Sequence, residues 1–116
     1  MENSKQVHCS EKEQQNMCNE FHDTIEFIGK RWIGVIIYHL LEGPKRYHEL
    51  MTAIPGISDR LLTERLKELE NSGLVIKKVV ASSPKKVEYE LTKLGMEFDI
   101  VIEAIVKWVK KNNEDK

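Results

Sequence analysis

Two cysteines carry the most reactive side chains of the sequence. Cys9 and Cys18 are too few for a disulfide framework, so reduced thiols are the expected state. A cysteine at a helix start gains thiolate character because backbone N–H groups and the helix dipole favour the anion. Cys18 is predicted just before the first helix, where Glu20 and Asp23 oppose that effect. Cys18 is therefore a candidate reactive thiol and Cys9 a candidate resolving thiol. The alternative for Cys18 is a small, half-buried structural residue.

The histidines give little reason to expect a reaction centre. They fall on separate predicted elements, with no nucleophile or carboxylate pair at useful spacing: His8, His22, His39 and His48. A zinc site built from two of them and the two cysteines would need His8, Cys9, Cys18 and His22, and this spacing matches no compact zinc knuckle. We therefore expect neither an enzyme nor a bound metal or cofactor.

A second group of polar side chains shares one face of a predicted helix over residues 58–71. At about 100° per residue, its leucines form one stripe that must face a core: Leu62, Leu66 and Leu69. The opposite face carries Arg60, Thr63, Glu64, Lys67 and Asn71. These side chains can donate to and accept from base edges and phosphates. Taken alone, such a face is more often simply a solvated surface.

Positive charge is concentrated in the middle of the chain. The total is −1, but residues 1–27, 28–57, 58–86 and 87–116 carry −4, +2, +3 and −2. Phosphates respond to a local face rather than to the total charge. Lys85 and Lys86 lie at the tip of a predicted hairpin, beside Lys77 and Lys78, where they would form a phosphate clamp.

The elements that must position these residues follow from periodicity and turn signals. Apolar spacing predicts helices and strands, with Gly43-Pro44 and Pro55-Gly56 as breaks and Ser58 and Thr92 as helix caps. The first predicted helix follows Cys18 and carries Phe21, Ile25 and Ile28, the other helices cover residues 30–41, 47–53, 58–71 and 92–111, and the strands cover 74–81 and 86–91. A short extended stretch is expected around Lys45 and Arg46.

This order predicts a mainly α fold with a small β-hairpin wing, a winged helix-turn-helix. In such a fold the second helix of the pair lies in a major groove and the hairpin reaches the neighbouring backbone. The function that follows is binding of double-stranded DNA. The residues assigned to DNA are Ser58, Arg60, Thr63, Glu64, Lys67, Lys85, Lys86 and Arg46.

Length and composition fit one soluble domain. The 116 residues are 41% hydrophobic and 32% charged. We expect a mobile tail over residues 1–16, the DNA-binding and dimerisation domain over 17–112 and a short tail over 113–116. No apolar run is long enough for a bilayer, and the polar, acidic start is unlike a signal peptide. The expected location is the cytoplasm, without a membrane partner.

The last predicted helix is apolar over more than one side, and a small core cannot cover it all. Its apolar residues include Phe98, Val101, Ile102, Ile105, Val106 and Val109. We expect it to form a homodimer together with the first helix, and the alternative is a monomer with an unusually apolar final helix. A twofold dimer would place two reading helices about 34 Å apart and predicts a near-palindromic site.

Five ordered blocks resemble the HxlR family of winged-helix regulators, which is related to MarR proteins, over about residues 17–110. The blocks are Ile28-Gly29-Lys30-Arg31-Trp32, Gly43-Pro44-Lys45-Arg46-Tyr47-His48-Glu49-Leu50, Ile54-Pro55-Gly56-Ile57-Ser58, Leu66-Lys67-Glu68-Leu69-Glu70 and Val87-Glu88-Tyr89-Glu90-Leu91-Thr92-Lys93-Leu94-Gly95. Within the family the chain is similar to YodB-like repressors, which respond to quinones and diamide. That resemblance implies that Cys18 is the sensing thiol, modified by a quinone, an aldehyde or an oxidant with release of DNA.

Two departures from these relatives bear on the chemistry. The C-terminal helix has no cysteine, which excludes an intersubunit disulfide there, and Cys9 lies in a longer tail. Alkylation, a mixed disulfide or a Cys9–Cys18 bridge remain open. The leading hypothesis is a repressor released from its operator by modification of Cys18. The alternatives are a winged-helix module that binds proteins, and a regulator with no thiol-sensing role.

Overall fold

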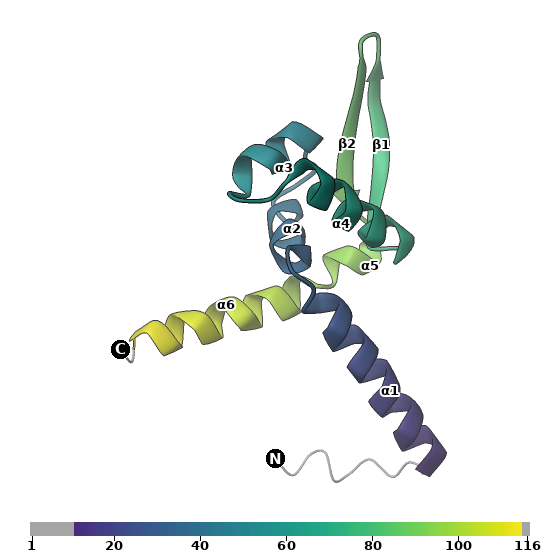
Figure 1. Ribbon diagram of the computed structural model, residues 1–116, viewed down its shortest axis with the longest axis vertical. Coiled ribbons are helices and arrows are strands. Elements are labelled where there is room, and N and C mark those ends of the chain that lie inside the picture. The colour runs from purple at the N-terminus through teal and green to yellow at the C-terminus, as the bar shows by residue number, and fades with distance from the viewer. Residues whose placement is uncertain (1–10, 115–116) are drawn as a thin grey trace. The chain divides into compact units, whose positions relative to one another are not determined.

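The computed structural model describes residues 11–114, and the chain divides into two units, Met1–Lys30 and Arg31–Lys116 (Figure 1). The first unit contains one described helix, and the second contains all the other elements. In chain order they are α1 (Glu11–Ile28), α2 (Ile33–Leu40), α3 (Tyr47–Ala53), α4 (Asp59–Asn71), β1 (Val75–Ser82), β2 (Lys85–Leu91), α5 (Lys93–Met96) and α6 (Asp99–Glu114). This mainly helical fold with a two-stranded antiparallel hairpin confirms the predicted class.

Helix α1 begins at Glu11, earlier than predicted, since the sequence placed even Cys18 before the helix. The prediction followed apolar spacing, and residues 11–16 contain no apolar side chain. Their glutamates, lysine and glutamines are nevertheless good helix formers, and Glu11 and Glu13 favour the positive end of the helix dipole. None of the α1 side chains is buried.

The largest shares of the core of the unit Arg31–Lys116 come from α2 and α4. Helix α2 contributes Ile33, Ile36, Ile37 and Leu40, and the leucine stripe of α4 is at most 2% exposed. Leu50 of α3, Val75 of β1 and Leu91 of β2 complete the buried layer around them. The leucine periodicity of residues 58–71 therefore predicted the buried face of α4 correctly.

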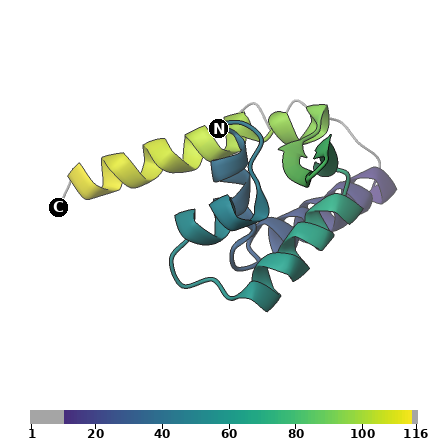
Figure 2. The same cartoon turned by 90° about the horizontal axis from the view of Figure 1, so that it is seen from above.

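Helix α3 has the predicted bounds, α4 begins at Asp59, directly after its predicted cap Ser58, and the two form the helix-turn-helix (Figure 2). Ser58 caps α4, because its hydroxyl accepts a hydrogen bond of 3.1 Å from the Leu61 amide. At the other end Gly73 adopts φ = 83°, the left-handed conformation that glycine permits. The Leu74 amide then donates to the Leu69 carbonyl at 3.0 Å, which closes a Schellman motif.

The predicted hairpin is confirmed, with Ser83 and Pro84 as its turn. Val75 pairs with Leu91 at the base and Ser82 with Lys85 at the tip, with an irregularity between Val79 and Ala81. The extended stretch expected near Lys45 is an isolated bridge, in which Lys45 and Tyr89 exchange both backbone hydrogen bonds. The bridge ties the segment before α3 to the hairpin.

The single helix predicted over residues 92–111 is wrong, since it forms two helices and ends at Glu114. Thr92 caps α5 as predicted, accepting from the Gly95 amide, and its hydroxyl also donates to the Gly73 carbonyl at 2.6 Å. These bonds fix α5 at the hairpin base, whereas α6 packs on α2. The chain must therefore change direction between Met96 and Asp99.

Helix α2 is also shorter than the predicted 30–41, because Trp32 precedes it in a left-handed conformation. Within the described residues, no helix combines the length and hydrophobicity that crossing a bilayer requires.

Candidate nucleic-acid interface

The polar face of α4 is accessible along its length. Arg60, Thr63, Glu64, Lys67 and Asn71 are all exposed, opposite the buried leucines. The side chain of Arg60 is 77% exposed and that of Glu64 is 47% exposed. These two side chains form an ion pair of 3.1 Å across one helical turn. Because the pair is exposed, a phosphate can compete for the arginine at little cost.

Tyr47 joins the first turn of α3 to this face. Its hydroxyl donates to the Asp59 carboxylate, lies 2.9 Å from the Asp59 carbonyl and 3.0 Å from the Thr63 hydroxyl. Partial burial raises the pKa of Tyr47, and the hydrogen bond to Asp59 raises it further. The phenol therefore stays protonated as a donor and holds the N-terminal end of α4 against α3. No local sequence pattern predicted this contact.

The hairpin tip supplies the second basic element. Lys85 and Lys86 are exposed, and neither forms an ion pair with a described residue. Lys78, nearer the base, pairs with Glu90 at 3.2 Å, so it is less available to phosphates. Figure 1 shows β1 and β2 projecting beyond the helices, which puts the two free lysines at the far end of the wing.

Arg46 and Ser58 have structural roles beside their predicted contacts with DNA. Arg46 is half-buried at the N-cap of α3, where its amide donates to the Glu49 carboxylate at 2.8 Å. The Ser58 hydroxyl is engaged as the cap of α4. Both residues precede a helix of the pair, which places them at the edge of the exposed face.

One internal contact of α4 was not predicted. The Arg65 Nε donates to the Arg31 carbonyl at 2.9 Å, and its side chain is only 14% exposed. Its Nη1 lies 3.3 Å from the Glu68 carboxylate. The helix projection placed Arg65 at the flank of α4, but nothing in the sequence identified its partner 34 residues earlier.

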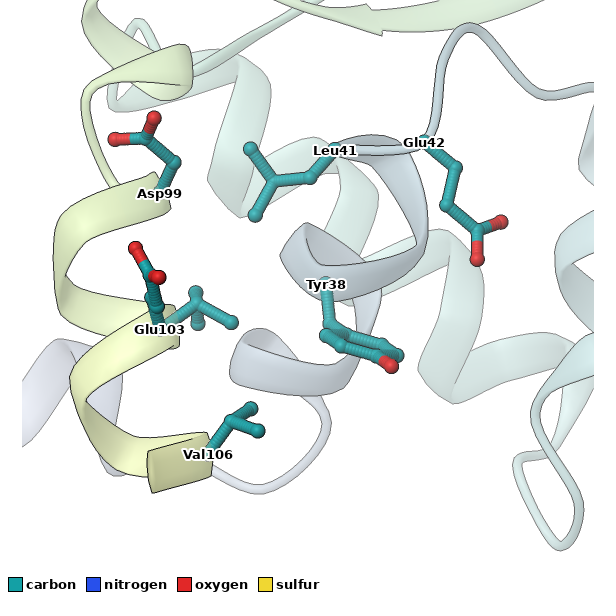
Figure 3. A pocket seen from close by; sticks show the side chains of 7 residues that line it. Tyr38, Leu41, Glu42, Asp99, Glu103 and Val106 are labelled. Atoms are coloured by element: carbon teal, nitrogen blue, oxygen red, sulfur yellow. The ribbon is translucent and has the colours of Figure 1, made fainter. Parts of the chain in front are cut away.

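An open pocket of about 350 Å³ lies between α2 and α6, away from the hairpin tip (Figure 3). Tyr38, Leu41, Ile102 and Val106 give it apolar walls, and three carboxylates line it: Glu42, Asp99 and Glu103. Lys45 and Lys107 pair with two of these carboxylates from outside the lining. An acidic lining repels phosphate, so this region does not extend the basic surface.

Comparison with known proteins agrees with this geometry. Residues 27–116 match the family described as HxlR-like helix-turn-helix. The chain belongs to the HxlR family. Two relatives from Bacillus subtilis are the helix-turn-helix transcriptional regulators YvaP and YodB. YvaP is 39% identical over 82% of this chain and 88% of its own, and YodB is 41% identical over 79% and 82%.

Solved HxlR structures show the same winged-helix fold. Reduced YodB from B. subtilis superposes with a TM-score of 0.73 at 39% identity, over 79% of this chain and 90% of its own. The redox regulator HypR in its reduced form gives 0.75 at 35% identity, over 81% and 93%. YodB has also been solved with a bound quinone, and that structure gives a TM-score of 0.71 at 37% identity, over 81% of this chain and 99% of its own.

The position predicted for Cys18 in this HxlR chain is wrong. Because α1 begins at Glu11, Cys18 lies inside the helix, where its amide is no longer among the unpaired N–H groups of the first turn. The dipole argument for its reactivity therefore does not apply. In the single chain its thiol is free and exposed. Cys9 and His8 lie outside the described residues. Within residues 11–114 no cluster of three metal-binding side chains occurs.

Proposed function

We propose that this protein is a homodimeric transcriptional regulator that binds a near-palindromic operator in double-stranded DNA. Helix α4 would enter the major groove, and Lys85 and Lys86 would contact the flanking phosphates. The observation that supports this most is the accessible polar face of α4 opposite a fully buried leucine stripe. The free lysines of the wing extend the same basic surface. Its cytoplasmic location follows from this role.

Individual contacts have different roles in this proposal. Arg60 and Lys67 can reach phosphates or guanine edges as donors, whereas Glu64 accepts from cytosine amino groups. The Tyr47 proton goes to Asp59, so Thr63 donates its own proton to the Tyr47 hydroxyl and keeps its lone pairs to accept from a base amino group. Arg46 and Ser58 would contact the backbone at the start of each helix.

The dimer is proposed from the uncovered side of α6. Val101, Ile105, Trp108 and Val109 recur at helical spacing and are 38–67% exposed. Helix α1 has a similar stripe, in which Met17, Phe21 and Ile25 are 51–65% exposed. Two stripes of this kind on one small chain are typical of surfaces that a second subunit covers. We propose that both helices contribute to the dimer.

We further propose that the protein is a repressor released when Cys18 is modified. The free, exposed thiol is one support, and the redox states described for HypR and the quinone-bound state of YodB are the other. A quinone would be attacked at a ring carbon by the sulfur, forming a C–S bond. The ring then takes up the proton and becomes a hydroquinone thioether, so no further reductant is required.

The test begins with duplexes selected by the protein from a random library, since this also reveals the operator. Binding of the best duplex is measured with and without benzoquinone, for wild type, Cys18→Ser and Cys9→Ser. We expect quinone to weaken wild type and Cys9→Ser but not Cys18→Ser. An equal response of Cys18→Ser would contradict the sensing role. If no duplex is enriched and the residual DNA binding does not depend on salt concentration, the protein would instead be a module that binds other proteins.

A further inference from the structure

The turn that leads into α2 has an unusual backbone. Among the described residues, Trp32 is the one non-glycine residue with positive φ, at 81°. A side chain in this conformation crowds its own backbone, so neighbouring groups must hold it there. The Trp32 carbonyl accepts from the Ile36 amide at 3.1 Å, which anchors one side of the turn. We call Arg31 and Trp32 the junction turn, because they begin the unit Arg31–Lys116.

The indole ring of Trp32 is held by contacts rather than by a hydrogen bond. Its Nε1 is buried and has no hydrogen-bond partner in the described part of the chain. The Arg31 guanidinium lies 4.8 Å from the ring centre, and the ring approaches the space beside Gly56. A buried donor without a partner gains from any movement that brings it to water. The ring is therefore sensitive to the geometry of the turn.

Arg65 holds the other side of the junction turn. Its Nε donates to the Arg31 carbonyl while its Nη1 reaches Glu68, so the planar guanidinium bridges two groups at once. The same Nη1 lies 3.9 Å from one oxygen of Glu64. The other oxygen of Glu64 bonds Arg60 on the exposed face. A continuous set of polar contacts thus joins the junction turn to the face of α4 proposed for DNA.

We propose that Arg65 is a positioning residue: its hydrogen bond to the Arg31 carbonyl couples the conformation of the junction turn to the orientation of Arg60 and Glu64. The inference rests on the proposed function for its biological meaning. The unit that carries Cys18 ends at Lys30, and Arg31 is the next residue along the chain. Without the hydrogen bond to the Arg31 carbonyl, the Arg65 guanidinium would contact only the carboxylates of Glu64 and Glu68. The orientation of Arg60 and Glu64 on the exposed face of α4 would then change.

The first test needs no DNA. The chain has two tryptophans, and Trp108 is 67% exposed on α6, so Trp108→Phe leaves Trp32 as the single tryptophan, which can be excited apart from the tyrosines. In that background we expect Arg65→Gln to raise acrylamide quenching of Trp32 about twofold and to shift its emission to longer wavelength. Lys67→Gln removes an exposed charge two residues further along α4, so it is the matched control and should leave the quenching and the emission wavelength unchanged. Unchanged quenching in Arg65→Gln would overturn the proposal.

Two further variants separate the hydrogen bond from charge and from stability. Arg65→Lys keeps the charge but cannot bridge a carbonyl and a carboxylate with a planar fork, so we expect it to behave like Arg65→Gln. Wild-type quenching in Arg65→Lys would show that charge alone is needed and would overturn the coupling. Ile36→Val removes a buried methyl group of α2 and destabilises the fold through the core. It should lower Tm without changing the quenching of Trp32.

The last test measures coupling on the selected duplex. Arg65→Gln should weaken binding about tenfold with an unchanged salt slope, whereas Arg60→Gln should reduce the slope by about one. Quinone should weaken Arg65→Gln by a smaller factor than wild type, because the contact that transmits the change is already absent. An equal factor would overturn the coupling. If quinone does not change the DNA affinity of wild type, the proposal that Cys18 is a sensor fails. The quenching of Trp32 still tests the role of Arg65 in that case.

Discussion

The hydroxyl of Tyr47 lies 3.0 Å from the hydroxyl of Thr63, and the same phenol donates to the carboxylate of Asp59. One side chain at the start of α3 therefore fixes two successive turns of α4. This contact sets the angle between the two helices of the helix-turn-helix from the exposed side, where the leucine core does not reach.

Replacing Tyr47 by phenylalanine should lower the free energy of unfolding by about 1 kcal/mol, since it removes partly exposed hydrogen bonds but no apolar contact. The effect should depend on pH. The pKa of Tyr47 is raised on folding, so its neutral form is stabilised, fully below about pH 10 and progressively less as pH rises through the folded pKa. In urea unfolding between pH 7 and 11, the free energies of unfolding of wild type and Tyr47→Phe should converge as the pH rises. A constant difference over this range would contradict the role of the phenol.

The helix-turn-helix was predictable because its signals are local. Ser58 and Gly73 mark the two ends of α4, and the leucine spacing between them identifies its buried face. The break at residues 97–98 was not predictable, because the apolar pattern continues through it. It depends on the packing of α5 against the hairpin base, which involves residues about twenty positions earlier in the chain.

The candidate site was predicted as a set of side chains but not as a set of contacts. Exposure of Arg60 and Lys67 follows from periodicity alone. The bonds of Tyr47 and Arg65 join residues 12 to 34 positions apart, and no local pattern encodes them. The start of α1 was missed for another reason, because helix propensity without an apolar stripe resembles a polar tail.

Ser58 combines a structural and a proposed binding role, which two substitutions can separate. Ser58→Ala removes the cap of α4 and should lower the free energy of unfolding by about 1 kcal/mol. Ser58→Asp keeps a good cap and should preserve stability, but its charge would repel a phosphate. We expect a more than tenfold weaker DNA complex for Ser58→Asp in binding assays, with an unchanged Tm. Normal DNA binding by this variant would place Ser58 outside the interface.

The wing lysines should act through phosphates rather than bases. Lys85→Ala and Lys86→Ala should each reduce the slope of log K against log salt concentration by about one, and the double variant by about two. All duplex sequences should weaken equally, since phosphate contacts carry no sequence information. Lys110→Ala on α6 provides a control for loss of a lysine outside the surface. A salt slope equal to that of wild type in the double variant would rule out the clamp.

Gly95 is required by a close approach between α5 and the chain before β1. A Cβ atom at this position would stand 2.2 Å from the Leu74 carbonyl oxygen. Gly95→Ala must therefore push α5 from the hairpin base, and we expect a loss of about 1–3 kcal/mol. Gly34 in α2 has open space around its Cα, so Gly34→Ala should be neutral or stabilise the helix by up to about 1 kcal/mol. Thermal unfolding of the pair checks the argument, and equal Tm values would contradict it.

The proposed dimer makes the most demanding prediction for DNA binding. Ile105 is 49% exposed at the centre of the apolar stripe of α6, and an aspartate there would be costly to bury between subunits. Ile105→Asp should sediment as a monomer at concentrations where wild type is a dimer. In a dimer, binding of one subunit holds the other subunit at a high effective concentration beside the second half-site. A monomer lacks this gain, so its affinity for the full operator should fall by about 100-fold or more. Lys107→Asp changes the charge on another face of α6, where the lysine side chain is 75% exposed, and should remain dimeric. A dimeric Ile105→Asp would show that this face of α6 does not join the subunits.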